Sequence, residues 1–193
     1  MIFNKKKSNI LFSGDDLFFK DLASRSSCYF EYGGGESTCW VLSNSKATVV
    51  TVDTSRSWLK EIERSVDFDI LRWRPIHVNV GDLEEWGRPV GFKFRSRFLY
   101  YACAPWRTRL EPDFILIDGR FRVCCFLASL VSARPGTIII FDDCVDRSQY
   151  HVCEEFLRPI DTIGRQAIFE VPKKFDDTSG IYDEMHKFSY VID

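Results

Sequence analysis

The sequence predicts an α/β fold with a mainly parallel β-sheet, and three observations lead to it. Short apolar runs alternate with segments of helical spacing along most of the chain. Two of the runs, 47–52 and 137–141, are rich in β-branched residues without regular polar alternation, which is typical of strands covered on both faces. Several runs end at aspartate or glycine, which favours turns after strands. Because the chain has 193 residues, we expect a single domain over 1–193.

The N-terminal segment, residues 1–27, is expected to form an extension and a helix that precede the sheet. Residues 1–12 are expected to be a loosely docked start. Ser13 or Asp15 then caps a short helix that runs through Ser24. The side chains spaced to share its apolar face are Leu17, Phe18 and Leu22.

The first half of the expected sheet contains three strands and two helices. The strands are predicted at 28–32, 47–52 and 75–80. One helix is expected to begin at Glu36 or Ser37, because an acidic or hydroxyl group suits the N-terminal dipole. Another is expected over 55–66, since its apolar and charged residues fall on opposite sides.

Between residues 83 and 112 the regular alternation stops, and tryptophans, tyrosines and basic residues accumulate. This segment is far longer than the usual connection of about 2–6 residues, so we expect it to be a functional insertion. Two helices are then expected, over 121–131 and 148–157. The remaining strands are predicted at 113–117, 137–141, 167–171 and 188–192.

Bulk properties exclude several classes of function. A formal net charge of -2 offers no basic field for a polyanion, so nucleic acid is not an expected partner. The seven cysteines are odd in number and contain no CxxC pair, which indicates reduced thiols in a cytoplasmic protein. No segment approaches the roughly 20 apolar residues of a membrane span, and the N-terminal apolar stretch is too interrupted for a signal peptide.

The segment Cys28–Thr38, with the sequence CYFEYGGGEST, predicts the main binding site. An apolar run stops at an acidic residue and breaks into three glycines, after which a helix is expected. Glycines let backbone N–H groups approach a ligand closely, because no Cβ stands in the way. Asp53 closes the next apolar run twenty residues after Gly33, as in the first half of a Rossmann-type nucleotide site.

Two details separate the cofactors that such a loop can hold. A dinucleotide site has a third glycine where this chain has Thr38, because its helix must pack close to the strand to receive a pyrophosphate. Glu31 adds a negative charge beside the loop, which repels a pyrophosphate but suits a ligand with a sulfonium and an ammonium group. S-adenosyl-L-methionine is therefore favoured over NAD.

The run Glu31-Tyr32-Gly33-Gly34-Gly35 resembles the E-x-G-x-G motif of class I S-adenosylmethionine-dependent methyltransferases. Asp53 matches their ribose-binding acid, and Gly81-Asp82 resembles the turn whose carboxylate meets the adenine amino group. The resemblance covers residues 28–193. It implies a Rossmann-like, doubly wound sheet of seven strands in the order 3-2-1-4-5-7-6, with an antiparallel last strand and helices on both faces.

The expected cofactor contacts come from the glycine loop, the strand-end acids and their neighbours. They are Glu31, Gly33, Gly34, Gly35, Ser37, Thr38, Asp53, Thr54, Asp82 and Asp118. Structural alternatives stay open for three of them. Glu31 can be an ordinary strand-end carboxylate, Asp53 a helix cap, and Asp82 part of a common Gly-Asp turn.

Three aspartates follow the fourth and fifth expected strands: Asp118, Asp142 and Asp143. The carboxyl ends of parallel strands meet at one edge of a sheet, where the methyl acceptor is expected. Three adjacent carboxylates repel one another unless a cation or a proton lies among them, and Mg²⁺ prefers oxygen ligands. The alternative is a metal-free pocket lined by Asp118 and Asp142, with Asp143 capping a turn. Arg120 and Arg122 are expected to steer an anionic acceptor or to pair with these carboxylates.

This placement is similar to that of catechol and metal-dependent sugar O-methyltransferases, where an Asp after strand four and a pair after strand five hold Mg²⁺. A bound metal would lower the pKa of a coordinated hydroxyl. The catechol enzymes carry a lysine base three residues after the first Asp, where this chain has Phe121. We therefore assign Asp118 and Asp142 as catalytic, with His151 as the candidate base and a plain surface histidine as its alternative.

These features predict an S-adenosylmethionine-dependent O-methyltransferase that acts on a hydroxyl of a small molecule or glycan. The aromatic residues of 83–112 can stack on sugar or aromatic faces, and a sugar is the favoured acceptor. The rivals are an NAD-dependent oxidoreductase and a non-catalytic methyltransferase-like binding subunit. The oligomeric state stays open, with a homodimer as one alternative.

Overall fold

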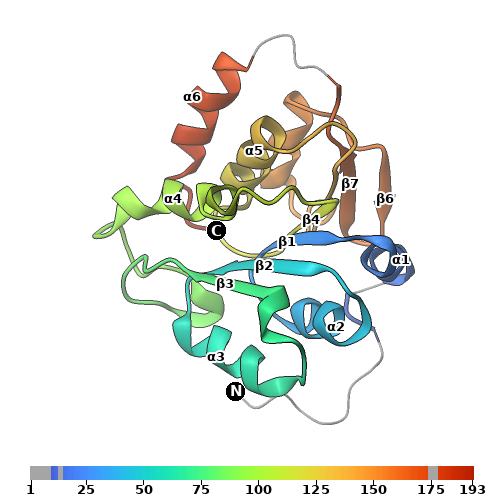
Figure 1. The fold of residues 1–193 in the computed structure, drawn as a ribbon. Coiled ribbons are helices and arrows are strands. Elements are labelled where there is room, and N and C mark those ends of the chain that lie inside the picture. The colour runs from blue at the N-terminus through green and yellow to red at the C-terminus, as the bar shows by residue number, and fades with distance from the viewer. Residues whose placement is uncertain (1–9, 13–14, 174–177) are drawn as a thin grey trace.

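The computed structural model describes residues 10–12, 15–173 and 178–193. Its strands are β1 (Cys28–Tyr32), β2 (Thr48–Asp53), β3 (Trp73–His77), β4 (Phe114–Ile117), β5 (Ile138–Phe141), β6 (Asp161–Ile163) and β7 (Gln166–Glu170). They form a seven-stranded sheet in the order β3-β2-β1-β4-β5-β7-β6 (Figure 1). The β1–β2, β1–β4, β2–β3 and β4–β5 pairs are parallel, whereas β7 runs antiparallel to both β5 and β6. The predicted Rossmann-like fold and strand order are confirmed.

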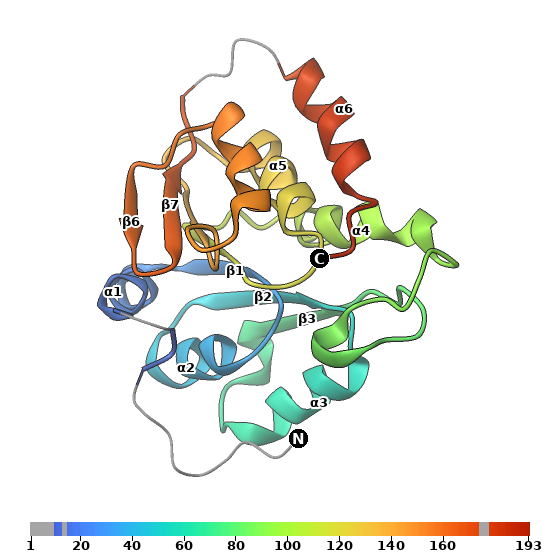
Figure 2. The same cartoon turned by 180° about the vertical axis from the view of Figure 1, so that it is seen from behind.

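Helices cover both faces of the sheet, as the two opposite views show (Figures 1 and 2). One face carries α1 (Leu17–Arg25), α2 (Glu36–Asn44) and α3 (Arg56–Ser65). The other carries α4 (Phe98–Cys103), α5 (Arg122–Ser132) and α6 (Ser179–Phe188). No helix in the described part of the chain has both the length and the apolar character needed to cross a membrane.

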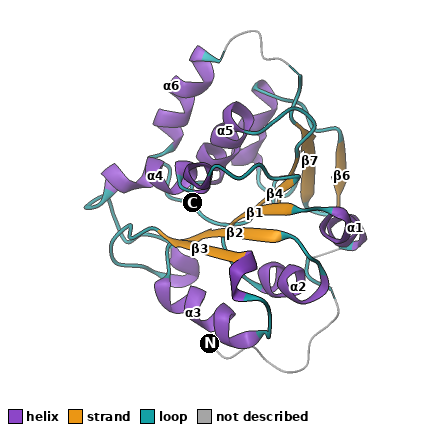
Figure 3. Cartoon of the chain, in the orientation of Figure 1, coloured by secondary structure: helices purple, strands orange, loops and turns teal. Residues whose placement is uncertain are grey.

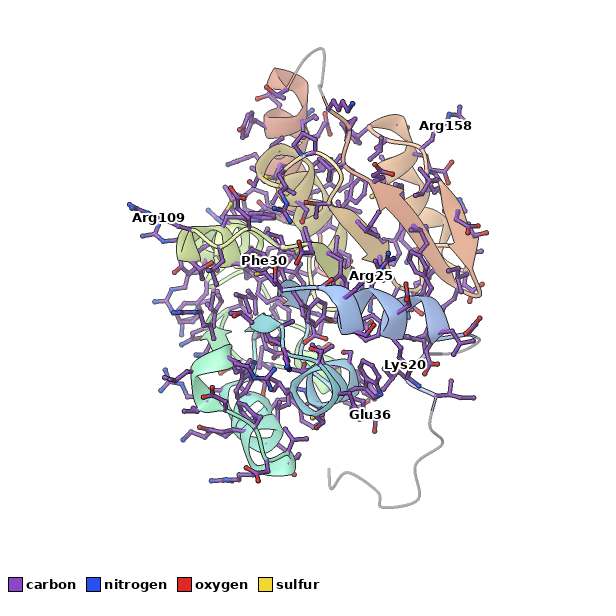
Figure 4. The ribbon with its side chains drawn as sticks, turned by 45° about the vertical axis from the view of Figure 1, so that its right-hand side comes forward. Lys20, Arg25, Phe30, Glu36, Arg109 and Arg158 are labelled. Carbon is purple, nitrogen blue, oxygen red and sulfur yellow. The ribbon has the colours of Figure 1, made fainter. Side chains whose placement is uncertain are left out.

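Each face of the sheet has its own hydrophobic core, because successive strand residues point to opposite sides. Phe30 and Ile117 pack with the residues of α5, whereas Tyr29 and Leu116 pack with those of α2. All four side chains are fully buried. Figure 4 shows Phe30 in the interior, with arginines such as Arg109 projecting from the outside.

The first helix packs through part of the predicted face, because Leu22 is buried and Phe18 lies half-buried against the core. Its start is displaced to Leu17, whose N–H donates to the Asp15 carboxylate at 2.8 Å. Leu17 is 68% exposed, while Phe19 is buried with its ring 5.8 Å from that of Tyr29. The aromatic contact determines which face turns inward. The proposed Ser13 cap and most of the expected loose start lie outside the described residues.

Two strand predictions need correction. The third strand spans Trp73–His77 rather than 75–80, because Trp73 pairs with Val49 in the parallel ladder. Pro75 is tolerated there since β3 is an edge strand. The predicted strand over 188–192 is wrong: Phe188 ends α6, and the missing strand is the short β6, which forms a hairpin with β7.

The segment between β3 and α4 contains loops and short 3-10 turns, visible as the long teal connection in Figure 3. These turns are η2 (Glu85–Gly87) and η3 (Arg95–Arg97), and η4 (Pro105–Thr108) follows α4. The predicted helix over 148–157 is the 3-10 helix η5 (Ser148–Glu155). Tyr32 fastens the segment to the sheet, because its hydroxyl donates to the Ala102 carbonyl at 2.6 Å and accepts from Trp106 Nε1 at 3.0 Å.

Candidate functional site

The three glycines after β1 form a loop whose backbone N–H groups all donate within the protein. Their acceptors are the Val52 carbonyl for Gly33 at 2.9 Å, the Asp53 carboxylate for Gly34 at 3.1 Å and the Thr38 hydroxyl for Gly35 at 2.9 Å. A pyrophosphate site needs such N–H groups to point at the ligand. This loop is therefore arranged for a ligand without a pyrophosphate.

The glycines are required for different reasons. Gly33 has a φ of 88°, and a Cβ there would lie 2.5 Å from the Cα of Gly119, so the ends of β1 and β4 touch through backbone alone. At Gly35 a Cβ would meet no described atom within 4 Å, and its φ of −174° is ordinary extended backbone. Internal packing does not demand glycine at position 35, which leaves that side of the loop available to a closely approaching ligand.

Glu31, at the end of β1, is fully buried. Its carboxylate accepts hydrogen bonds from the hydroxyls of Ser37 and Thr38 in the first turn of α2, and from Tyr29 at 2.8 Å. Thr38 in turn accepts from the Gly35 N–H, so Glu31 holds the glycine loop and the helix start in one network. Glu31, Ser37 and Thr38 thus have partners inside the protein, and their direct contact with the cofactor stays a prediction.

Burial raises the pKa of Glu31 to about 7, although the three hydroxyl donors act in the opposite direction. A carboxyl group with this pKa is only partly ionised at neutral pH. Its charge therefore contributes less to cofactor choice than the sequence suggested, and its hydrogen bonds contribute more.

Asp53, at the end of β2, lies beside the glycine loop as predicted. Its Oδ1 accepts from the Ser55 N–H at 2.7 Å and its Oδ2 accepts from Gly34, so each oxygen keeps acceptor capacity. Burial raises its pKa to about 6, against the backbone donors that favour the ionised form. The acid is thus a loop-holding group with lone pairs left for a ligand hydroxyl.

Two other expected cofactor residues lie under or on the segment that follows β3. The Thr54 hydroxyl is buried and donates to the Gly87 carbonyl at 2.7 Å, so residues near Gly87 cover the end of β2. Asp82 is exposed, and its backbone carbonyl accepts from Val90 at 2.9 Å. A ligand that reaches Thr54 must therefore move the covering loop.

The three aspartates after β4 and β5 come together as predicted. One oxygen from each of Asp118, Asp142 and Asp143 lies within 4.8 Å of the others. Asp142 is fully buried, Asp143 is nearly so, and the Asp118 side chain is 34% exposed. Asp118 is therefore the member of the cluster that a ligand can reach.

Three arginines surround this cluster and take up its negative charge. Arg165 binds Asp142 with two nitrogens, at 2.5 and 3.1 Å, and also lies 3.1 Å from Asp143. Arg122 reaches Asp118 at 3.0 Å and Asp143 at 3.3 Å. The remaining contact joins Arg147 to Asp143 at 2.8 Å.

The arginine contacts follow from the sheet register. Phe141 pairs with Ala167 in the antiparallel β5–β7 ladder. Continuing that register places Gln166 opposite Asp142 and Arg165 opposite Asp143. The Gln166 amide accordingly donates to Asp142 at 3.1 Å.

These residues do not fit a Mg²⁺ site as they are arranged. Three carboxylates suit Mg²⁺ in ligand chemistry, but three guanidinium groups already balance their charge and occupy the buried oxygens. A metal would have to displace Arg165 from Asp142 inside the protein. Of the two alternatives that the sequence left open, the geometry supports the metal-free one, and the positive φ of Asp143 at 61° agrees with its turn role.

Asp118 has the properties of a proton acceptor at neutral pH. Removal of the Asp118 carboxyl group from water raises its pKa to about 7, and the nearby negative charges of Asp142 and Asp143 act in the same direction. Arg122 acts in the opposite direction. His151, the predicted base, is exposed on η5, and its ring nitrogen lies 3.4 Å from the Val145 carbonyl. The contacts of the described residues include none between His151 and the aspartates, so Asp118 is the better placed of the two candidates for the base.

Arg147 and Arg165 are the site residues that the sequence reasoning missed. The pairing of Arg147 could have been predicted, because it stands four residues after Asp143. The pairing of Arg165 could not, since it depends on the register between β5 and β7. Arg122 was assigned correctly to one of its two alternatives, the pairing with nearby carboxylates.

The strand order, the glycine loop after β1 and the acid after β2 together define the class I S-adenosylmethionine-dependent methyltransferase fold, which confirms the predicted resemblance. Within this class the chain is similar to a methyltransferase-like protein from Silicibacter pomeroyi, with 27% identity and a TM-score of 0.80 over 90% of this chain and 92% of that one. Neither the protein-family models nor the curated proteins include a match to the sequence.

Two more distant structures share the fold. A cofactor-bound protein from MTB has 17% identity and a TM-score of 0.52, covering 81% of this chain and 79% of that one. The C-terminal domain of precorrin-6Y C5,15-methyltransferase from Rhodobacter capsulatus has 15% identity and a TM-score of 0.50, covering 85% and 96% respectively.

Proposed function

We propose that the protein is an S-adenosylmethionine-dependent O-methyltransferase that methylates a hydroxyl group, with a sugar or glycan as the favoured acceptor. The observation that carries the proposal is the position of Asp118. It follows β4 directly beside Gly119, whose backbone touches the glycine loop, and its carboxylate is the accessible one in its cluster. A proton acceptor thus stands next to the expected methyl donor site.

The glycine loop supports this donor over a dinucleotide. Gly35 leaves an open side for a ligand, and Asp53 retains acceptor capacity for ribose hydroxyls. The loop N–H groups that a pyrophosphate would need are paired inside the protein. When bound, S-adenosylmethionine supplies an electrophilic methyl group on a positively charged sulfur.

Asp118 would act as the general base in the transfer. One of its oxygens would take the proton of the acceptor hydroxyl, which the site would hold in line with the bond between methyl and sulfur that breaks in the transfer. Arg122 holds the carboxylate in place through its contact at 3.0 Å. A base with a pKa near the working pH is well matched to this role.

The acceptor side is formed by the insertion 83–112. Trp86, Phe92 and Tyr100 are exposed by 78%, 52% and 44% respectively, and flat aromatic faces stack on sugar rings. Their exposure supports a bulky or flat acceptor. A sugar is favoured because stacking of this kind does not require the acceptor itself to be aromatic.

Calorimetry with S-adenosylhomocysteine and with NAD tests the donor, and binding of NAD alone would end the proposal. Methyl transfer is then followed with labelled donor and a panel of sugars and catechols. Asp118→Asn should lower kcat by about 10²–10⁴-fold, the range of general base catalysis, and leave S-adenosylhomocysteine binding nearly unchanged. Exposed His151→Asn serves as the matched control and should retain activity.

A non-catalytic methyltransferase-like protein is the second candidate. The observation that favours it is the covering of the donor edge by the chain itself, through Gly87 over Thr54 and Tyr101 over the Val52 carbonyl at 3.2 Å. This protein would bind S-adenosylhomocysteine without transferring methyl to any acceptor. Transfer that Asp118→Asn removes would exclude it.

A further inference from the structure

The start of α5 holds a carboxylate supplied by the chain itself. Asp193 Oδ1 accepts from the Phe121 N–H at 2.6 Å, and Oδ2 accepts from the Arg122 N–H at 3.2 Å. The Arg120 guanidinium donates to the backbone carbonyl of Asp193. Both opposite views place this end of the chain centrally, between α4 and the strands β1 and β2 (Figures 1 and 2).

Two buried polar groups beside this carboxylate are incompletely paired. Tyr150 is 1% exposed, and its hydroxyl lies within reach of the Asp193 carboxylate without a hydrogen bond of good geometry among the described residues. It faces Asp193 closely enough that, after burial, the aspartate charge is the next cause of its raised pKa. The Nε of Arg120 is also buried without a partner among the described residues. A helix cap alone needs neither group.

The position of this carboxylate connects the two halves of the proposed active site. Arg122 binds Asp193 through its backbone and Asp118 through its guanidinium, at 3.0 Å. The positive charge of Arg120 also acts on Asp53, whose pKa it lowers against the effect of burial. The carboxylate is therefore linked to the expected base through Arg122 and, through the charge of Arg120, to the expected ribose acid.

We propose that the start of α5, with Arg120 and Tyr150, forms a carboxylate-binding subsite that the Asp193 side chain occupies here and that a carboxylate of a reactant takes over. The helix dipole, two backbone donors and a guanidinium match this ligand class. The carboxylate comes either from the amino-acid part of the methyl donor or from an acidic acceptor such as a uronic acid. The choice of these two sources rests on the proposed function.

The test compares the wild-type protein with Asp193→Ala and Asp193→Asn. Four probes are titrated by calorimetry: S-adenosylhomocysteine, its decarboxylated analogue, glucuronate and glucose. We expect one carboxylate probe to bind about tenfold more tightly to Asp193→Ala, as a competing charged group is removed, while the affinity of its partner without a carboxylate shows no such gain. Asp193→Asn keeps a capping oxygen and should show a smaller gain, which guards against misfolding of the alanine variant.

Adding Arg120→Met to Asp193→Ala should abolish the gain. A gain for S-adenosylhomocysteine alone assigns the carboxylate to the donor, and a gain for glucuronate alone assigns it to the acceptor. If both folded variants bind all four probes as the wild type does, Asp193 is only a helix cap and the subsite is refuted. If S-adenosylhomocysteine binds no variant, the proposed donor fails, and glucuronate against glucose still decides the subsite.

Discussion

Replacing Arg165 with methionine should destabilise the protein substantially, because it strips a fully buried carboxylate of its main partner. Removing one member of a buried ion pair costs about 3–5 kcal/mol. Arg165 is 31% exposed and Gln166 continues to donate to Asp142 at 3.1 Å, so we expect about 3 kcal/mol at pH 7, the lower end of that range. For a chain of 193 residues this corresponds to a fall in Tm of about 6–12 °C.

Urea denaturation of Arg165→Met, Asp142→Asn and the double variant measures how much of this loss belongs to the pair. We expect a coupling free energy of about 2 kcal/mol, because Asp142→Asn removes the charge that the missing arginine leaves unpaired. Arg25→Met, in the exposed Arg25–Asp21 pair, is the control and should not change the midpoint measurably. Additive effects, with a coupling free energy below about 0.5 kcal/mol, would refute the view that Arg165 balances the negative charge of Asp142.

Three further predictions concern the loop, its buried acid and the metal. Gly33→Ala should prevent stable folding, because its Cβ would lie 2.5 Å from a backbone atom of Gly119. Gly35→Ala should fold normally and weaken the binding of S-adenosylhomocysteine. Equal urea midpoints for the two variants would contradict this difference. Glu31 binds its proton more tightly in the folded state, so its contribution to stability is complete below pH 4.5 and is lost as the pH rises through about 7. The urea midpoint of Glu31→Gln should therefore gain on that of the wild type across this window, and parallel curves would count against the raised pKa. EDTA should leave methyl transfer and Tm unchanged, and a Tm that Mg²⁺ raises and Asp143→Asn makes insensitive would restore the metal site.

The main architecture could be predicted because its signals are local. The β-branched runs, the glycines after β1 and the acid after β2 each fall within a few residues, and the parallel pairing follows from their alternation with helices. The strand β6 was missed because its three residues, Asp161–Ile163, are too few to show a period. The apolar residues Tyr190, Val191 and Ile192 suggested a strand, but they follow the end of α6 as a turn and irregular backbone, and α6 itself packs against α5.

The direction of a side chain was much harder to predict than its position. Glu31 stands at the expected place in the motif, yet its carboxylate turns toward Ser37 and Thr38 because their hydroxyls satisfy it inside the protein. The sequence shows which residues are near the loop, but not which of them form their hydrogen bonds inside the protein. The same holds for Asp142, whose partner Arg165 is identified only once the antiparallel register is known.

The hydrogen bonds of the Tyr32 hydroxyl divide the segment after β3 into an inner stretch, which is bonded to β1, and an outer stretch, which is not. Residues 98–108 are fastened from beneath by Ala102 and Trp106, whose contacts with Tyr32 belong to the sheet itself. The preceding stretch carries the exposed Trp86 and Phe92 and has no such anchor to β1 among the described contacts. Under the proposed function, exchange of the outer stretch alone would change the surface offered to the acceptor, while the inner stretch keeps its contacts with the sheet. Grafting that outer stretch between related proteins would therefore test whether it sets acceptor choice.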